Sequence, residues 1–532
     1  MIARAASETR TPVRRRERLA VGALLLLLVG MNLAVMSRTS ETLDERFHVD
    51  YGRRLLAGHP ERIAAFDSSK MPVSAANALP SVIADSLPAG LWKNRLGGLA
   101  AARLATVGAA ALLALVVWAW ARRLYGPVSG GVALFLCAFD PNLLAHSHLA
   151  TTDVYTALGF TAAFWTAWRA GHAAGLRPLF AHGAALGFAQ LTKYFALLAY
   201  PLLAAIEAWR ARRARRPLAP VAGRWALALA VSLVVVAAGF RFDRPLRAAA
   251  TFEFWSKPFQ RLAATPLLGA LPIPLPAAYL EGLDMALDAE RERPTYGRTY
   301  LLGRLHEKGV PGYYLIAALV KVPLPVLILG AVALAGYVAR RRRFAFWDDE
   351  VYYLAPLAAF TLYLNFYYNA QIGIRHALIV FPFGYLLIAA LFVEGWPEAR
   401  RRRLALGALA LWLVASFAAA YPYYIPYFNE LLPDRKFGYR ILSDSNVDWG
   451  QATGELRAWL AAHPEAVYAP QTPVAGRVVV SVNGLTGVVA GERFAWLRPL
   501  SPVDHVAYSY LVFEVSEPFA AAARARGAGV SP

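Results

Sequence analysis

The chain has 532 residues, 58% of them hydrophobic, and a formal net charge of +20 at pH 7. Soluble globular proteins average about 45–50% apolar residues. The excess here falls into runs of about 17–25 residues, the length that crosses a hydrocarbon core of about 30 Å. The composition excludes an ordinary soluble protein and predicts a polytopic membrane protein. The single cysteine, Cys137, excludes an intramolecular disulfide and a cysteine-based zinc site.

The positive charge is gathered in short segments between apolar runs, at 14–18, 210–216, 340–343 and 400–403. This is the positive-inside pattern of cytoplasmic loops. A nucleic-acid-binding protein would instead carry a basic face interleaved with aromatic residues on a soluble domain. The first apolar run lacks a small-residue cleavage site before "SRTSET", so it is interpreted as a retained signal anchor.

With the amino terminus in the cytoplasm, the charge pattern predicts eleven spans and two long outside loops, at 37–95 and 241–311. Residues 181–209 lie between two basic inside loops, so two short helices are needed there, with Lys193 at their outer turn. Such short helices require packing within protein or a polar cavity. The predicted spans are 19–36, 97–120, 129–145, 150–168, 181–191, 194–209, 222–240, 312–338, 350–368, 377–396 and 404–422.

The composition changes after the last span. Residues 1–422 form the predicted transmembrane module, and residues 423–532 form a small outside domain. In the latter, "LRAWLAAH" is typical of a short helix, whereas "GRVVVSVNG" and "HVAYSYLVFEV" are typical of strands. The predicted fold class is therefore an all-α polytopic membrane protein with a small α/β extracytoplasmic C-terminal domain.

The adjacent acids Asp44 and Glu45 directly follow the first span. A partly desolvated carboxylate there is a reasonable general base, because burial raises its pKa toward working pH. The alternative is an ordinary solvated acid at the membrane interface, which is the commoner case for an isolated pair of acids.

The phrase "DPNLLAHSHLATTD" places His146 and His148 just before Asp153, at the start of a predicted span. One interpretation is helix capping, since Asp suits a helix N-terminus. The other is the polar wall of a cavity that holds substrate hydroxyls or a divalent metal ion. The spacing alone leaves both open, and no cofactor is assigned.

Cations also lie at the outer face. Lys193 lies at a helix junction, and Arg375 and His376 lie between two spans. Most interfacial Lys and Arg side chains simply extend toward lipid headgroups. An Arg–His pair is also suited to grip a phosphate, with arginine binding through its bidentate fork.

Together these phrases resemble the GT-C polytopic glycosyltransferases of family 39, which include the protein O-mannosyltransferases and the aminoarabinose transferase of lipid A. The matching phrases run from about residue 40 to 455. They are "LDERFH", "FDPNLLAHSHLATTDV", "GFAQLTKYFALL", "QIGIRHALIVFPF" and "YFNELLPDRKFGYRILSDSNVDWGQ".

The resemblance implies transfer of a sugar from a polyprenyl-phosphate donor to an unidentified acceptor, on the extracytoplasmic face of a bacterial inner membrane. It implies a catalytic base at Asp44 with Glu45 beside it, and no nucleotide-sugar site. It also implies a functional acid at Asp153. With the residues singled out above, the predicted substrate-binding set contains His48, Lys70, His146, His148, Asp153, Lys193, Arg375 and His376.

One departure concerns the first outside loop, which reads "HPERIAAFDSSKMPVSAANALP" where many bacterial relatives carry a phrase like "HPPL". In this loop Lys70 is expected to take over a contact to phosphate or carboxylate. Two other functions stay open. A lipid or sugar flippase would show inverted repeats, which the sequence lacks, and a scaffold protein would leave the polar residues without a role.

Overall fold

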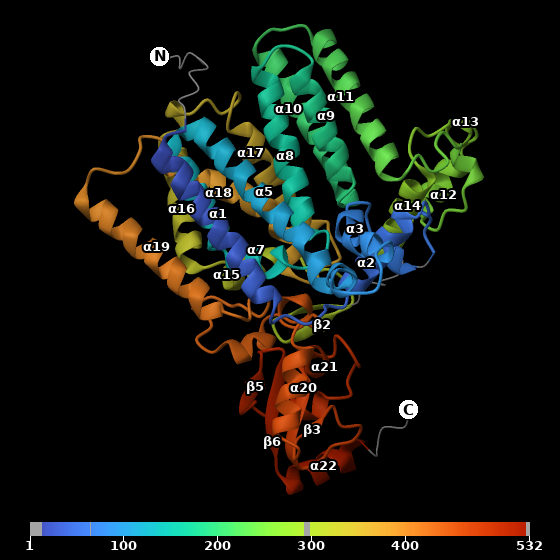
Figure 1. The fold of residues 1–532 in the computed structure, drawn as a ribbon, viewed down its shortest axis with the longest axis vertical. Helices are drawn as coiled ribbons and strands as arrows, with labels where there is room; N and C mark the ends of the chain where they lie inside the picture. The colour runs from blue at the N-terminus through green and yellow to red at the C-terminus, as the bar shows by residue number, and fades with distance from the viewer. Residues whose placement is uncertain (1–12, 64, 292–297, 528–532) are drawn as a thin grey trace.

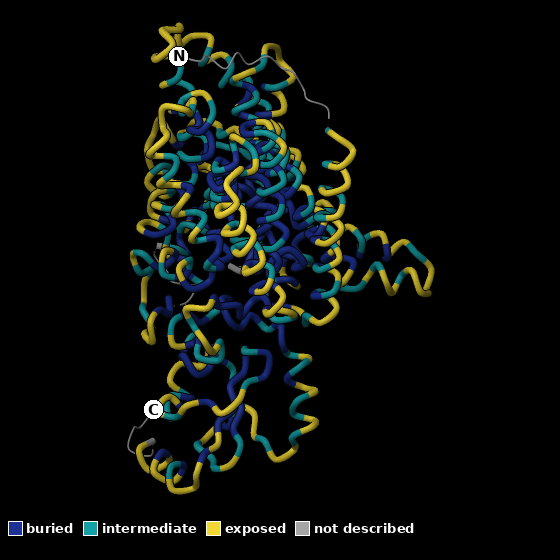
Figure 2. The backbone as a smooth tube through the Cα atoms, turned by 90° about the vertical axis from the view of Figure 1, so that its left-hand side faces the viewer, coloured by how far each residue is buried: buried dark blue, intermediate teal, exposed yellow. Residues whose placement is uncertain are grey.

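The computed structural model describes residues 13–63, 65–291 and 298–527. A helical bundle forms the larger part of the molecule, and a smaller unit with a sheet lies beyond one end of it (Figure 1). The bundle carries most of the buried residues, as its dark interior shows (Figure 2). The predicted fold class, a helical polytopic membrane protein with a small α/β unit at the C-terminus, is confirmed.

Every predicted span coincides with one or more helices. In the described residues, five helices are long and apolar enough to cross a membrane, or up to seven if each of two bent pairs counts as one span. The five are α1 (Arg15–Met36), α5 (Leu99–Tyr125), α11 (Leu218–Gly239), the continuous run Ile374–Phe392 and α19 (Arg400–Ala420). That run comprises η5 (Ile374–Val380), α18 (Phe381–Ala389) and η6 (Ala390–Phe392).

Two of the predicted spans, 129–145 and 312–338, are bent helix pairs in the structure. Helix α6 (Pro127–Ala138) and α7 (Pro141–Ser147) meet at 63°, and α15 (Tyr313–Lys321) and α16 (Leu324–Ala339) meet at 118°. The predicted span 312–338 is therefore divided between two helices at a sharp bend. Pro323 explains the break, because a proline inside a helix would remove a backbone hydrogen bond and clash with the preceding turn.

The remaining predicted spans correspond to shorter or more polar helices packed within the bundle. The split of 181–209 into two helices is observed, with the break at Lys193. These helices are α8 (Asp153–His172), α9 (Arg177–Gln190), η2 (Tyr194–Leu198) with α10 (Ala199–Arg213), and α17 (Val351–Phe366).

The segment predicted as the first outside loop is mostly helical. Helix α2 (Glu45–Leu56) packs against α3 (Ser74–Asp85), with η1 (Ala65–Ser69) between them and α4 (Leu91–Gly97) after them. Gly52 permits the close approach, because a Cβ there would overlap the Ser74 carbonyl. The loop therefore forms a fixed layer beside α5.

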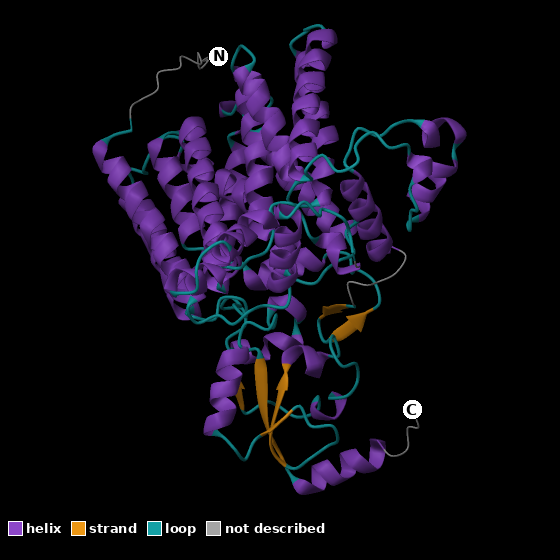
Figure 3. Cartoon of the chain, turned by 45° about the vertical axis from the view of Figure 1, so that its right-hand side comes forward, coloured by secondary structure: helices purple, strands orange, loops and turns teal. Residues whose placement is uncertain are grey.

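The segment predicted as the second outside loop also contains helices and strands. After α11 come η3 (Ala249–Thr251), α12 (Lys257–Ala264), α13 (Pro266–Ala270) and α14 (Ala277–Arg291). A short antiparallel hairpin follows, formed by β1 (Thr299–Leu301) and β2 (Arg304–His306). Helices α12 and α13 project from the side of the bundle (Figures 1 and 3).

The C-terminal unit is built on a four-stranded sheet in the order β3-β4-β6-β5. Strand β4 pairs antiparallel with β6, and Val478, Val480, Leu511 and Phe513 are buried in the main core. The strands are β3 (Val467–Tyr468), β4 (Gly476–Ser481), β5 (Asp504–Val506) and β6 (Tyr510–Val515), and the helices are η7 (Arg435–Arg440), η8 (Asp444–Asn446), α20 (Thr453–Ala462), α21 (Val482–Thr486), η9 (Ala495–Leu497) and α22 (Glu517–Gly527).

The two ends of the bundle differ in charge. At the arginine-rich end, Arg122 pairs with Glu17 at 2.5 Å and Arg210 pairs with Asp348 at 3.3 Å. The short helix η4 (Arg341–Arg343) also lies there. The C-terminal unit lies beyond the opposite end (Figure 1). This separation is the one that the charge pattern predicts.

Candidate active site

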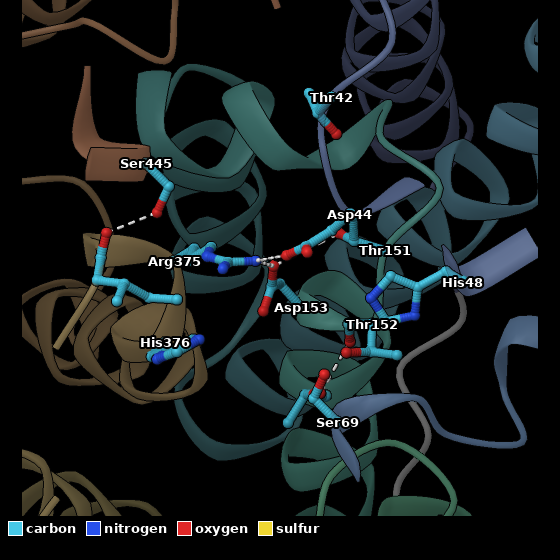
Figure 4. A network of polar contacts seen from close by, with 12 residues as sticks. Thr42, Asp44, His48, Ser69, Thr151, Thr152, Asp153, Arg375, His376 and Ser445 are labelled. Atoms are coloured by element: carbon cyan, nitrogen blue, oxygen red, sulfur yellow. Dashed lines mark hydrogen bonds and ion pairs between the residues drawn. The ribbon is translucent and has the colours of Figure 1, made fainter. Parts of the chain in front are cut away.

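Arg375 joins two carboxylates from distant parts of the chain. Its Nη1 lies 3.1 Å from Asp44 Oδ2 and 3.6 Å from Asp153 Oδ2 (Figure 4). Asp44 immediately precedes α2, Asp153 begins α8, and Arg375 lies in η5. Three predicted site residues are thereby gathered at one point, at the end of the bundle that faces the C-terminal unit.

Two lysines complete this group. Lys193 Nζ lies 2.5 Å from Asp153 Oδ1, and Lys70 Nζ lies 3.7 Å from Asp44 Oδ1. Side chains of Lys70 and Arg375 are only 5% and 7% exposed, whereas that of Asp44 is 28% exposed. Asp44 is thus the more accessible acid of a group that contains three cations and two carboxylates.

The cations decide the ionisation of Asp44. Burial by itself raises the pKa of this carboxyl, but the charges of Lys70 and Arg375 outweigh burial and hold the pKa well below its ordinary value. Burial lowers the pKa of Lys70, and the Asp44 carboxylate opposes that effect. Asp44 is therefore ionised at neutral pH, and its basicity depends on how strongly the cations are engaged elsewhere.

The loop that carries Arg375 is fixed by the segment 443–451, which contains the motif "SDSNVDWGQ". Asn446 Oδ1 accepts a hydrogen bond from Ile374 N at 3.0 Å, and Ser445 Oγ donates to Ile372 O at 2.7 Å. A Cβ on Gly373 would overlap Ser445 Oγ, so this close approach requires glycine. These contacts set the position of the Arg375 backbone.

Trp449 extends the same segment to the guanidinium of Arg375. The Arg375 Cζ atom lies 4.0 Å from the centroid of the Trp449 ring, which is a cation–π contact. The Trp449 carbonyl accepts from Leu43 N at 3.0 Å, and Gln451 O accepts from Ser40 N at 2.8 Å. One segment therefore holds both Arg375 and the loop leading to Asp44.

Glu45 has a different environment from its neighbour. It is fully buried, and its carboxylate accepts two hydrogen bonds from Arg103, each at 2.7 Å. Backbone N–H groups of Thr42 and Ala150 donate to the same carboxylate. Both oxygens are thus occupied, so the geometry does not favour the predicted catalytic role of Glu45 and instead shows an anchor between the first loop, α5 and the start of α8.

The predicted histidines fall into two groups. His48 Nδ1 lies 3.1 Å from Ser74 Oγ, and His376 Nδ1 donates to Ala370 O at 3.0 Å. Both flank the charged group (Figure 4). Burial lowers the pKa of His48 well below its ordinary value, and the nearby charge of Lys70 adds to this. His48 is therefore neutral at physiological pH.

The other two histidines contact different partners. The ring of His146 lies 5.9 Å from the Trp449 ring, centroid to centroid. His148 Nδ1 donates to Leu144 O at 3.0 Å, and its Nε2 lies 3.3 Å from Thr39 Oγ1. Burial lowers the pKa of His148 to about 4. His148 lies near the Arg103–Glu45 anchor, away from the charged group.

The structure does not favour the divalent-metal interpretation of this region. Among residues 13–63, 65–291 and 298–527, no group of three or more His, Cys, Asp or Glu side chains is placed to hold a metal ion. The Asp153 carboxylate faces Lys193 and Arg375, so its oxygens are bound to protein cations.

Several residues at the site were missed by the sequence interpretation. Arg103 lies inside a long apolar run, and that unusual position was the available signal. Asp444, Asp448 and Trp449 belong to the quoted motif "DSNVDWGQ" but received no role. Burial raises the pKa of Asp444 and of Asp448 to about 6. The charge of Arg375 lowers the pKa of Asp444, whereas the charge of Asp44 raises it.

The family model for dolichyl-phosphate-mannose-protein mannosyltransferases matches residues 96–238. This stretch is similar to those mannosyltransferases. It covers less than half of the chain, from α5 to α11, and it includes Asp153 and Lys193 but neither Asp44 nor Arg375. The resemblance predicted from the sequence is confirmed over this stretch. No curated protein matches the chain in sequence.

Solved structures give more distant likenesses. The Archaeoglobus fulgidus oligosaccharyltransferase in its apo form is 15% identical with a TM-score of 0.46, and the match covers 77% of this chain and 55% of that one. This chain therefore spans about half the length of the archaeal protein. ArnT from Cupriavidus metallidurans bound to undecaprenyl phosphate is 14% identical with a TM-score of 0.31, covering 94% of this chain and 98% of that one.

Proposed function

We propose that the protein is a membrane glycosyltransferase that moves a sugar from a polyprenyl-phosphate donor to an acceptor hydroxyl on the extracytoplasmic face. The observation that carries the proposal is the joining of Asp44 and Asp153 by Arg375, with Lys70 and Lys193 beside them. The match of residues 96–238 to mannosyltransferases supports the same class of reaction.

In the proposed reaction, the donor phosphate engages Arg375 and the two lysines. Its negative charge then offsets the cations that hold down the pKa of Asp44, so the carboxylate becomes a better base once the donor is bound. Oriented cations also stabilise the charge that develops on the leaving phosphate. The same cations thus keep Asp44 ionised before the donor binds, and they stabilise the leaving phosphate after the donor has bound.

The bonds change in one displacement. The acceptor oxygen attacks the anomeric carbon as the bond between that carbon and the phosphate oxygen breaks. Asp44 receives the proton of the acceptor hydroxyl, and the polyprenyl phosphate leaves with the electron pair. Attack from the face opposite the phosphate inverts the anomeric configuration. Asp153 holds Arg375 and Lys193 in place throughout.

The proposed orientation places the amino terminus in the cytoplasm and the C-terminal unit outside a bacterial inner membrane. The arginine clusters support it, because they lie at the end of the bundle opposite the site. The donor's lipid chain then lies between helices of the bundle, and the donor's phosphate reaches the site at the extracytoplasmic surface of this membrane.

The test is transfer of radiolabel from a polyprenyl-phosphate sugar by the purified protein in lipid vesicles. Labelled acceptor, with label lost from the lipid, supports the proposal. Label that only changes leaflet while still attached to the lipid indicates a flippase. Transfer that is unchanged in Asp44→Asn contradicts the proposed role of Asp44.

A further inference from the structure

The segment between α11 and α14 forms a separate projection, which we call the lateral arm, residues 244–276. It contains η3, α12 and α13 and stands away from the bundle on one side (Figures 1 and 3). The sequence interpretation treats this region only as part of an outside loop. Its surface is more apolar than that expected of a loop in water.

The lateral arm exposes large apolar side chains. Leu267 is 73% exposed, Leu246 is 62% exposed, and Leu268, Leu271 and Trp255 are 46–50% exposed. No residue of α12 is buried, although the helix is amphipathic. An apolar surface of this kind is unfavourable in water and marks a contact with a membrane or a protein.

The arm is nevertheless an ordered structure. At its base, Leu246 N donates to Ile273 O at 3.2 Å and Ile273 N donates to Arg247 O at 3.0 Å. Asp284 of α14 accepts hydrogen bonds from Ser256 N at 2.9 Å and from Ser256 Oγ at 2.6 Å. The backbone that carries the exposed apolar residues is therefore held in place by these hydrogen bonds.

The position of the arm brings it to the membrane boundary. It begins a few residues after α11, one of the helices able to span a membrane. The end of α11 packs on the chain next to the candidate site, since a Cβ on Gly239 would overlap Leu191, two residues before Lys193. The arm thus begins at the end of α11 that packs beside the chain leading to the site.

The net charge of the arm indicates which kind of lipid it would bind. Residues 244–276 contain four basic side chains and one acidic side chain, a net charge of +3. The basic residues Arg247, Lys257 and Arg261 alternate with the apolar ones. Apolar residues with interspersed cations are the pattern of interfacial helices that bind anionic lipids. Helix α4, with Leu91 60% and Trp92 67% exposed and with Lys93 and Arg95 in the same turn, shows the same composition.

We propose that the lateral arm lies in the membrane interface of the leaflet nearest the site and binds anionic phospholipids there. Its exposed leucines enter the acyl-chain boundary, and its cations contact lipid phosphates. The arm then fixes the depth of the bundle in the membrane. This role is independent of sugar transfer.

The experiment uses the full chain in lipid nanodiscs and a fluorescent label on a single cysteine. Cys137 is buried and is the sole cysteine, so Cys137→Ala gives a background without thiols. Leu267→Cys places the label on the arm. Val503→Cys, 54% exposed on the C-terminal unit, is the matched control. A nitroxide on a phospholipid probes lipid contact, and aqueous iodide probes exposure to water.

We expect the Leu267→Cys label to be quenched by the lipid nitroxide and shielded from iodide, and the Val503→Cys label to behave in the opposite way. Quenching of both labels by iodide alone overturns the proposal. Shielding from both quenchers, with oxidative cross-linking between copies of Leu267→Cys, shows a protein interface and also overturns it.

Anionic lipid is tested by comparing phosphatidylglycerol-rich nanodiscs with pure phosphatidylcholine ones. Docking of the arm, followed as lipid quenching, should be stronger in the anionic lipid. Arg261→Glu should weaken it there by more than about fivefold, since removing one basic residue at such a surface costs about 1 kcal/mol and the new acid is repelled. Arg457→Glu, exposed on α20, should leave it unchanged. Equal docking in both lipids, or an equal effect of both variants, contradicts the anionic preference.

Discussion

Trp449 stacks on Arg375, with the guanidinium carbon 4.0 Å from the centroid of the indole ring. The two residues come from different parts of the fold, since Arg375 lies in η5 and Trp449 lies in the segment between η8 and α20. The aromatic face and the two carboxylates contact the same guanidinium. The segment after the last spanning helix is therefore part of the wall of the candidate site.

Replacing Trp449 tests this positioning role. Trp449→Leu removes the cation–π contact, which is worth about 1–2 kcal/mol at a desolvated site. We expect the KM for the lipid donor to rise by about tenfold, whereas Trp449→Phe retains a ring and should show a smaller rise. Steady-state transfer kinetics of both variants provide the measurement. Trp459→Leu, on the C-terminal unit, is the control, and equal effects at both tryptophans would argue against a specific role.

Asp44→Asn tests the proposed base. The amide keeps the size of the side chain but cannot accept the acceptor's proton, and general-base assistance contributes about 10²–10⁴-fold. We expect kcat to fall by about that factor while the protein remains folded. Asp50→Asn is a matched control, because Asp50 lies on α2, the helix that Asp44 precedes, and 59% of its side chain is exposed. A kcat for Asp44→Asn near that of Asp50→Asn would mean that another group accepts the proton of the acceptor hydroxyl.

Arg375→Lys tests the bridge between the acids. Lysine keeps the charge, but its compact ammonium does not reproduce the planar fork that contacts two carboxylates and stacks on Trp449. We expect donor binding to weaken by at least tenfold with little loss of folded protein. Binding of undecaprenyl phosphate to the purified variant checks this directly. Arg46→Lys, whose side chain is 78% exposed in the wild type, should bind like the wild type, and equal affinity in both variants would exclude a phosphate contact for Arg375.

Glu45 and Arg103 form a fully buried pair, so removing one partner leaves the other charge unpaired. Arg103→Met should lower the free energy of unfolding by about 3–5 kcal/mol, and the double variant Arg103→Met with Glu45→Leu should recover part of that loss. Thermal unfolding in detergent measures both. Glu41→Gln, exposed in the same loop, should have no effect.

The same experiment separates an anchor from a catalytic acid. If Glu45 acts only as an anchor, turnover per folded molecule in the double variant should fall much less than in Asp44→Asn. A loss of kcat as large as that of Asp44→Asn, in protein that is fully folded, would restore Glu45 to the catalytic group.

The raised pKa of Asp448 should make the stability of the protein depend on pH. Burial raises its pKa from 3.8 to about 6, so the folded state binds a proton more readily than the unfolded state. This contribution to stability is complete below pH 3.8 and is lost as the pH rises through about 6. The difference corresponds to about 3 kcal/mol, at about 1.4 kcal/mol per pKa unit.

Asp448→Asn should therefore unfold at a higher temperature than the wild type at pH 7.5 and at a similar temperature at pH 4. The amide oxygen can still accept the hydrogen bond that Gly450 N donates to the carboxylate at 3.1 Å. Thermal unfolding across this pH range provides the measurement. Asp504→Asn, exposed on β5, should not change the profile, and an unchanged profile in Asp448→Asn would place the titration elsewhere.

By itself, the sequence determined the membrane class and the positions of the helices, and it predicted that the polar residues gather at one end of the bundle. It even located the break at Lys193, because the arginine clusters on either side of 181–209 allow only an even number of crossings. Apolar length and loop charge are local properties, and the cost of burying each side chain in lipid depends mainly on its own chemistry. Pro323 is a local signal for a break after α15, but the size of the bend there, 118°, depends on how α15 and α16 pack.

Only the tertiary structure decided which polar residues meet. Asp44 and Arg375 are 331 positions apart, and no local pattern relates them. The adjacent acids Asp44 and Glu45 look equivalent in sequence, but the turn into α2 directs one to Arg375 and the other to Arg103. Long-range contacts of this kind arise from the packing of the whole chain, and packing determines which charge is buried beside which partner.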